Sequence, residues 1–166
     1  MVKVNKEFYS VIDVENLFNQ WHPDVKEFTS KLNKEYVLSI LKSTPPSFFN
    51  ISKYQEVLNL TNSKYCKTLL IRILREKNTD KFINLLKERD ETHPRDISRG
   101  YSIEELLQSV EDNSYHPILF LELNKKLYII DGRTRFYCCL FLKIPAKVRI
   151  ISDNELSRKC TIKSQI

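Results

Sequence analysis

The segment Asp131-Gly132-Arg133-Thr134-Arg135 places two guanidinium groups beside a glycine, a combination suited to binding phosphate. An apolar strand is predicted before the glycine and a helix directly after it. Because the first amides of a helix have no partner inside it, they attract anions, and glycine lets the backbone approach one closely. Arginine adds bidentate hydrogen bonds to phosphate oxygens. We therefore predict a phosphate site with the ligands Gly132, Arg133, Thr134 and Arg135; an ordinary turn with two solvated arginines is the alternative.

Four carboxylates are candidates for catalysis at this site. Asp131 could orient an arginine, bind a metal or contact a ribose hydroxyl. Glu104 and Glu105 could serve as a general base or hold a metal, and Asp96 is a further candidate. Glu104 and Glu105 are equally well explained as first-turn residues of a helix, because Ser102 and Glu105 have the spacing of a capping box.

The chain is basic, with 27 lysine and arginine residues against 21 aspartate and glutamate residues and a net charge of +6. This balance favours an anionic partner, either a nucleotide or DNA, although a solvated lysine-rich surface gives the same value. The cluster of Arg72, Arg75, Lys77 and Lys81 could follow a phosphate backbone, or it could be a solvated helix face. An acidic, disordered interaction module is excluded.

The cysteines and the apolar segments indicate a cytoplasmic protein. Cys66, Cys138, Cys139 and Cys160 match no zinc signature, so we predict no metal site, and the adjacent pair reads as small core residues in a reducing compartment. No apolar stretch approaches the roughly 20 residues that span a bilayer, and the N-terminus lacks the apolar core of a signal peptide.

Hydrophobic periodicity predicts an α+β fold, in which a helical N-terminal region packs on a small mixed-sheet domain. The polar stretch 91–96 is the predicted boundary, which gives a helical region 1–92, a phosphate-binding domain 93–156 and a polar tail 157–166. In the first region we expect an edge strand within 1–12 and helices over 13–20, 24–32, 34–42 and most of 51–90. In the second we expect a helix from Ser102, strands over 118–123, 127–130 and 146–151, a turn at 124–126 and a helix over 134–142.

The segment from Ser102 to Asp153 resembles the ParB/sulfiredoxin superfamily in the order and spacing of its elements. Members show an acidic amphipathic helix, a His-Pro or Gln-Pro step, a hairpin ending in a Gly-x-x-Arg box, a short helix and a final Pro-led strand. The matching residues here are Ile103 to Leu107, His116-Pro117, Gly132 to Arg135 and Ile144-Pro145. The likeness covers about a third of the chain.

This resemblance implies that the box binds the phosphates of a nucleotide, ATP or CTP, with or without Mg²⁺. Pro94-Arg95 is similar to the Pro-Arg step of ParB proteins, which implies Arg95 and Arg99 as further ligands. The implied function is nucleotide binding by a protein that acts on or with DNA, of phage or plasmid type. The alternatives are a phosphotransferase like the free-serine kinases, a nuclease, or a protein-binding inhibitor whose helical region contacts its partner.

The chain departs from the superfamily patterns at three points. Arg133 stands where sulfiredoxins carry their catalytic cysteine, so we do not expect sulfiredoxin activity. The glutamate of the ParB box Gly-Glu-Arg-Arg is missing, and Thr134 replaces the histidine of the Asp-Gly-x-His-Arg pattern. Only 15 residues follow Ile151, so we expect no helix-turn-helix domain after the box.

Overall fold

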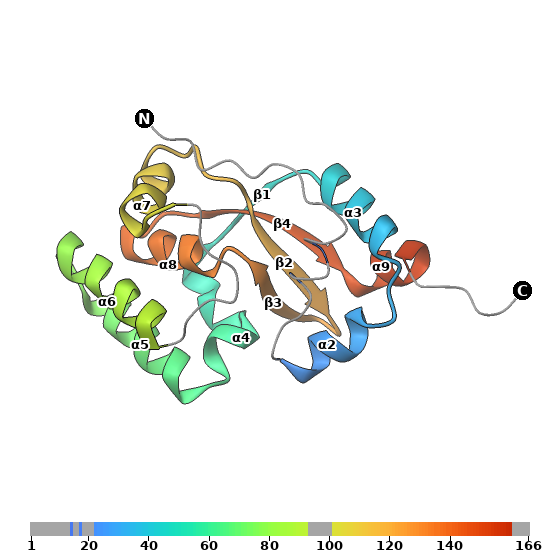
Figure 1. Ribbon diagram of the computed structural model, residues 1–166, viewed down its shortest axis with the longest axis horizontal. Helices are drawn as coiled ribbons and strands as arrows, with labels where there is room; N and C mark the ends of the chain where they lie inside the picture. Colours follow the sequence, from blue (N-terminus) through green and yellow to red (C-terminus); the bar gives the residue numbers. More distant parts are fainter. Residues whose placement is uncertain (1–13, 15–16, 18–21, 93–100, 161–166) are drawn as a thin grey trace, which may run out of the picture.

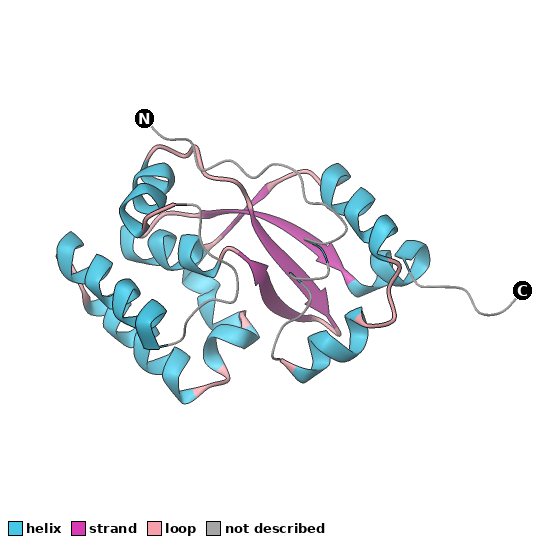
Figure 2. Ribbon diagram, viewed as in Figure 1, coloured by secondary structure: helices cyan, strands magenta, loops and turns pink. Residues whose placement is uncertain are grey.

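The computed structural model describes residues 14, 17, 22–92 and 101–160, which form a four-stranded mixed sheet with helices on both faces (Figures 1 and 2). The α+β fold expected from the sequence is therefore confirmed. Before the boundary the elements are α2 (Pro23–Thr29), α3 (Lys34–Ser43), β1 (Ser47–Phe49), the 3-10 helix η1 (Ile51–Glu56), α4 (Leu58–Thr61), α5 (Lys64–Arg75) and α6 (Thr79–Thr92). After it come α7 (Ile103–Glu111), β2 (Ile118–Leu123), β3 (Lys126–Asp131), α8 (Arg133–Leu142), β4 (Ala146–Ser152) and α9 (Asp153–Cys160).

The strand order in the sheet is β1-β4-β2-β3. Strands β2 and β3 form an antiparallel hairpin, β4 runs parallel to β2, and β1 runs antiparallel to β4. The hairpin turn has positive φ at Asn124 (52°) and Lys125 (66°), the backbone that a two-residue turn needs to match the twist of its strands. The predicted hairpin is therefore confirmed, and the chain leaves β3 directly into the glycine of the candidate site.

Each face of the sheet has its own core. One face buries Phe120, Ile129 and Val148 against α7 and α8, and α5 and α6 pack outside those two helices (Figure 1). The other face buries Leu121 and Ile151, with further apolar side chains from α2, α3 and α9. Because α8 lies between the sheet and the outer helices, seven of its residues, Thr134 to Leu140, are buried, as expected of a helix that is apolar all round.

The sequence-based boundary falls beside residues 93–100, which lie outside the described part of the chain. Strand β1, from before the boundary, is hydrogen bonded to β4, from after it, and both regions contribute side chains to both cores. The expected edge strand within 1–12 also lies outside the described residues, as does most of the expected helix over 13–20, although Val14 is buried in the second core.

Two elements were not predicted from the sequence. Strand β1 has three residues, too few to show a period. Helix α9 continues to Cys160, past the point where we expected a frayed polar tail. It is held there because Leu156 is fully buried against the second core.

Candidate functional site

The turn between β3 and α8 depends on Gly132. Its φ of 99° and ψ of 27° lie in the left-handed region, where side chains are strained. A Cβ placed on this residue would lie 2.8 Å from Nη2 and 3.0 Å from Cζ of Arg135. The glycine is therefore needed both for its backbone conformation and for the guanidinium group that folds back over it.

Arg135 holds the turn together from inside. It is 7% exposed, and its Nη2 donates to Oδ2 of Asp131 at 3.1 Å. Its Nη1 donates to the carbonyl oxygens of His116 and, at 3.3 Å, of Pro117. One guanidinium thus joins the end of β3 to the segment that enters β2. The structure therefore gives Arg135, predicted as a phosphate ligand, internal partners, and Asp131, predicted as catalytic, a place in the same clamp.

Thr134 is also turned inward, with 5% of its surface exposed. Its Oγ1 accepts a hydrogen bond of 2.7 Å from Nη2 of Arg89, on α6. Arg89 is in turn bound to Oδ1 of Asp90 at 2.8 Å and lies 5.5 Å from the centre of the Tyr137 ring. The Thr134 hydroxyl therefore links α8 to α6.

Arg133 is the member of the predicted set that borders a cavity. A pocket of about 140 Å³ lies where α2, α5 and α8 begin. Its lining combines side chains from the helix starts and from α4: His22, Pro23, Asn59, Asn62, Ser63, Cys66 and Arg133. Arg133 is the arginine of this lining, which also includes His22.

Most of the other polar groups of the pocket already support its walls. Asn59 bonds to both backbone groups of Ile129, from Nδ2 to the carbonyl at 2.8 Å and from the amide to Oδ1 at 2.9 Å, and so covers the edge of β3. Ser63 caps α5 by accepting from the amide of Cys66 at 3.1 Å. His22 caps α2 through Nδ1 and packs edge-on against Tyr128, with ring centres 4.8 Å apart.

The helix starts differ in how they are capped. At four helices the side chain of the N-cap residue accepts a hydrogen bond from a backbone amide of the first turn. These residues are His22 at α2, Asn33 at α3, Ser63 at α5 and Ser102 at α7. At α8 the N-cap is Gly132, which has no side chain to accept such a hydrogen bond. The N-cap residue of α8 therefore leaves the first amides of the helix to other partners.

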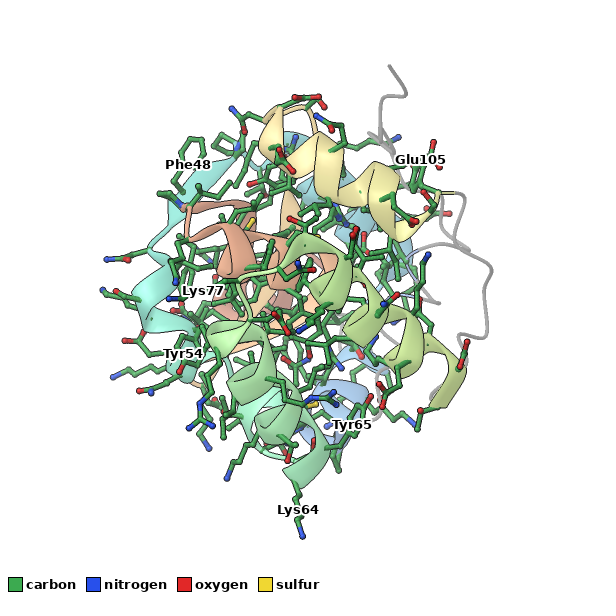
Figure 3. All side chains as sticks on the ribbon, turned by 90° about the vertical axis from the view of Figure 1, so that its left-hand side faces the viewer. Phe48, Tyr54, Lys64, Tyr65, Lys77 and Glu105 are labelled. Atoms are coloured by element: carbon green, nitrogen blue, oxygen red, sulfur yellow. The ribbon has the colours of Figure 1, made fainter. Side chains whose placement is uncertain are left out.

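Glu104 and Glu105, predicted as catalytic candidates, lie on the first turn of α7, where Figure 3 shows Glu105. Glu105 forms a capping box with Ser102: the Ser102 amide donates to Oε1 of Glu105 at 2.9 Å, and the Glu105 amide donates to the Ser102 hydroxyl at 3.0 Å. Glu104 accepts a hydrogen bond of 3.0 Å from Lys87, which lowers the pKa of its carboxyl. Both therefore have structural partners at the surface.

The remaining candidates give no further geometry. Arg95, Asp96 and Arg99 lie outside the described residues. Within the described ranges, no group of three or more His, Cys, Asp or Glu side chains is placed to hold a metal ion. A search of the same residues finds no helix long and apolar enough to cross a membrane.

The adjacent cysteines are buried in the core, as predicted. Burial raises the pKa of the Cys139 thiol to about 11, and its Sγ lies 3.7 Å from the Tyr115 hydroxyl, to which it donates. Because the thiolate is the nucleophilic form, such a thiol is poorly suited to cysteine catalysis. This agrees with a site that depends on charge and shape.

Sequence reasoning missed the pocket residues outside α8. The Asn62-Ser63 pair was visible as helix-capping chemistry, but its position opposite Arg133 depends on the packing of α5 against α8. His22 and Asn59 carry no local signal at all. Comparison of this chain with protein-family models, with curated proteins and with solved structures finds no match.

Proposed function

We propose that this protein binds the phosphate group of a nucleotide in the pocket at the start of α8, with Arg133 as the cationic ligand. The observation that carries the proposal is that Arg133 and the starts of α5 and α8 border one pocket. Backbone amides at a helix start carry partial positive charge, so the guanidinium and the helix ends favour the same kind of ligand.

The size of the pocket supports a phosphate group in preference to a whole nucleotide. Pockets that enclose a drug-sized ligand measure roughly 300–1,000 Å³, whereas this one measures about 140 Å³. We infer that one or two phosphate groups enter and that the nucleoside, ATP or CTP by the ParB/sulfiredoxin resemblance, stays outside. The order of α7, β2, β3, α8 and β4 along the chain is the order that this resemblance implies.

The clamp beneath the pocket supports the proposal indirectly. Arg135 and Asp131 fix the turn at Gly132, and the turn sets the direction in which α8 begins. A rigid start of α8 keeps the Arg133 side chain at the pocket with little entropy lost on binding. In this proposal Gly132 and Arg133 form the site, while Thr134 and Arg135 hold it in shape.

Thermal unfolding with a ligand panel tests the proposal. The panel is ATP, CTP, the two nucleosides, inorganic phosphate and pyrophosphate, each with and without Mg²⁺. We expect a nucleotide at about 100 times its Kd to stabilise the protein by about 2.7 kcal/mol and raise the Tm by roughly 5–10 °C. The nucleosides should have no effect, because they lack the phosphate.

The matched variants are Arg133→Ala and Arg158→Ala, each of which removes one arginine. Arg158 is exposed on α9, on the opposite side of the sheet from α8 (Figure 1). Arg133→Ala should lose the nucleotide-dependent shift and Arg158→Ala should keep it. A flat response of the unmodified protein, or an undiminished shift in Arg133→Ala, would falsify the proposal.

A further inference from the structure

The outer face of α5 is exposed and rich in cations. The buried residues of this helix, Cys66, Leu69, Leu70 and Ile73, face α8 and α4. The residues at the spacing of one helical face on the other side are all exposed, and we call them the basic stripe: Lys64, Lys67, Thr68, Ile71 and Arg75. Figure 3 shows Lys64 projecting away from the body of the protein.

Positive charge is concentrated in and just beyond this helix. Residues 64–81 contain six lysine and arginine residues and two carboxylates, a net +4, whereas the whole chain has a net charge of +6. Helix α5 itself contains four cations and no carboxylate. The exposed face of the neighbouring α6 is mixed, because it shows Asp80, Glu88 and Glu91 beside Lys81 and Lys87.

The stripe has little internal charge compensation. Arg72, beside the stripe, lies 3.9 Å from Glu88, and both side chains are more than half exposed. In the described part of the chain no carboxylate lies within 4.0 Å of Lys64, Lys67 or Arg75. Arg72 and Arg75 lie in the last turn of α5, where the helix dipole favours cations. Lys64 and Lys67 lie in the first half of the helix and are like charges three residues apart, which is unfavourable for the helix. Helix stability therefore accounts for the arginines and not for the two lysines.

We propose that the basic stripe of α5 binds the phosphate backbone of double-stranded DNA. This inference goes beyond nucleotide binding and does not depend on the α8 pocket. A helix of 12 residues is about 18 Å long, and each strand of duplex DNA carries one phosphate per roughly 3.4 Å of the axis, so the stripe spans about five phosphates of one strand. The diameter of an α-helix, about 10–12 Å, matches the width of the major groove, where the exposed Ile71 would contact thymine methyl groups.

The test measures the affinity for a 20-base-pair duplex over a series of salt concentrations. One variant combines Lys64→Gln, Lys67→Gln and Arg75→Gln. The matched control combines Lys125→Gln, Lys126→Gln and Arg158→Gln, which removes the same charge from exposed positions at the hairpin turn and on α9, at the other end of the molecule (Figure 1). Each lost phosphate contact reduces the magnitude of the slope of log K against log salt by about 0.9. The slope of the stripe variant should therefore be smaller in magnitude by about 2–3 than that of the unmodified protein.

We expect the stripe variant to bind DNA at least about tenfold more weakly at low salt, and the control to bind as the unmodified protein does. Equal losses in both variants would mean that only net charge matters and would overturn the proposal. The proposal would also be overturned if the protein bound RNA, or anionic lipid vesicles at the same charge concentration, tenfold more tightly than the DNA duplex. Urea unfolding of both variants, and the single variants Lys67→Gln and Arg75→Gln, separate lost contacts from lost folding.

The two proposals fail in different measurements. The stripe variant should keep the nucleotide-dependent rise in Tm, since Arg133 is unchanged. Arg133→Ala should keep the salt-dependent affinity for DNA. Loss of DNA binding in Arg133→Ala with the stripe intact would overturn the assignment to α5.

Discussion

The first turns of α7 and α8 differ in how their backbone amides are capped. Both helices leave their first amides without helical partners. At α7 the side chains of Ser102 and Glu105 fill that role, and Lys87 neutralises Glu104 beside them. At α8 the cap is a glycine, and the neighbouring arginine borders a pocket. The comparison shows that the acidic turn is capped by its own side chains, whereas the basic turn is not capped by its N-cap residue.

The two arginines of α8 repeat this contrast within one turn. Arg135 is buried and donates hydrogen bonds to Asp131 and to two carbonyl groups, whereas Arg133 is partly exposed at the pocket. Two residues of the same type, two positions apart, thus have different surroundings: Arg135 holds the turn together, and Arg133 borders the pocket.

The largest expected effect is on stability, from Arg135→Ala. This change leaves Asp131 without its cation and removes the donor from the His116 and Pro117 carbonyls. Because breaking a buried ion pair from one side strands the partner charge, the loss should be about 3–5 kcal/mol in urea unfolding. Arg133→Ala should lower the free energy of unfolding by less than about 1 kcal/mol, because Arg133 is partly exposed at the pocket. Equal losses would remove the distinction between the two arginines.

Gly132→Ala should destabilise the protein by about 2 kcal/mol, through backbone strain at positive φ and the contact with Arg135. A double-mutant cycle with Arg135→Ala separates the two causes. The combined loss should be smaller than the sum of the single losses, because the guanidinium that meets the new Cβ is gone. Strict additivity would mean that Arg135 does not fold over the glycine.

At α7, Ser102→Ala should destabilise the protein by about 1 kcal/mol, since it removes the acceptor for the Glu105 amide. Ser157→Ala, an exposed change inside α9, serves as the control and should produce no loss. The nucleotide-dependent rise in Tm should be the same in Ser102→Ala as in the unmodified protein. A reduced rise would mean that the start of α7 contributes to the ligand site.

Much of the C-terminal fold could be predicted because its signals are local. The continuous apolar run from Ile118 to Leu123 indicates a buried strand, Asn124 suits a turn with positive φ, and Ser102 with Glu105 marks a helix start. Strand β1 and helix α9 could not be predicted, because they exist through contacts with distant elements. For α9 the decisive contact is the burial of one residue, Leu156.

The site shows the same limit more sharply. The glycine and its two arginines located the turn at the start of α8, but the direction of each arginine was not encoded locally. Arg135 turns inward because the carbonyls of His116 and Pro117 lie beneath it, 19 and 18 residues earlier in the chain. His22 and Asn59 reach the pocket from more than 70 residues away, so only the packed structure brings them to Arg133.

The smallest expected effect is the pH dependence of the α7 start. The hydrogen bond from Lys87 lowers the pKa of Glu104 below its ordinary value of 4.5, so the folded state favours the charged carboxylate. This contribution is present above pH about 4.5 and is lost as the pH falls through the lower folded pKa. Urea unfolding should show that the free energy of unfolding falls slightly less between pH 6 and pH 3 in Glu104→Gln than in the unmodified protein. Lys87→Gln should show the same difference. Because the pair is half exposed, 1 M salt should largely abolish the difference. A difference that survives high salt would mean that the α7 start is held by a buried charge, and the contrast with α8 would then be one of charge sign alone.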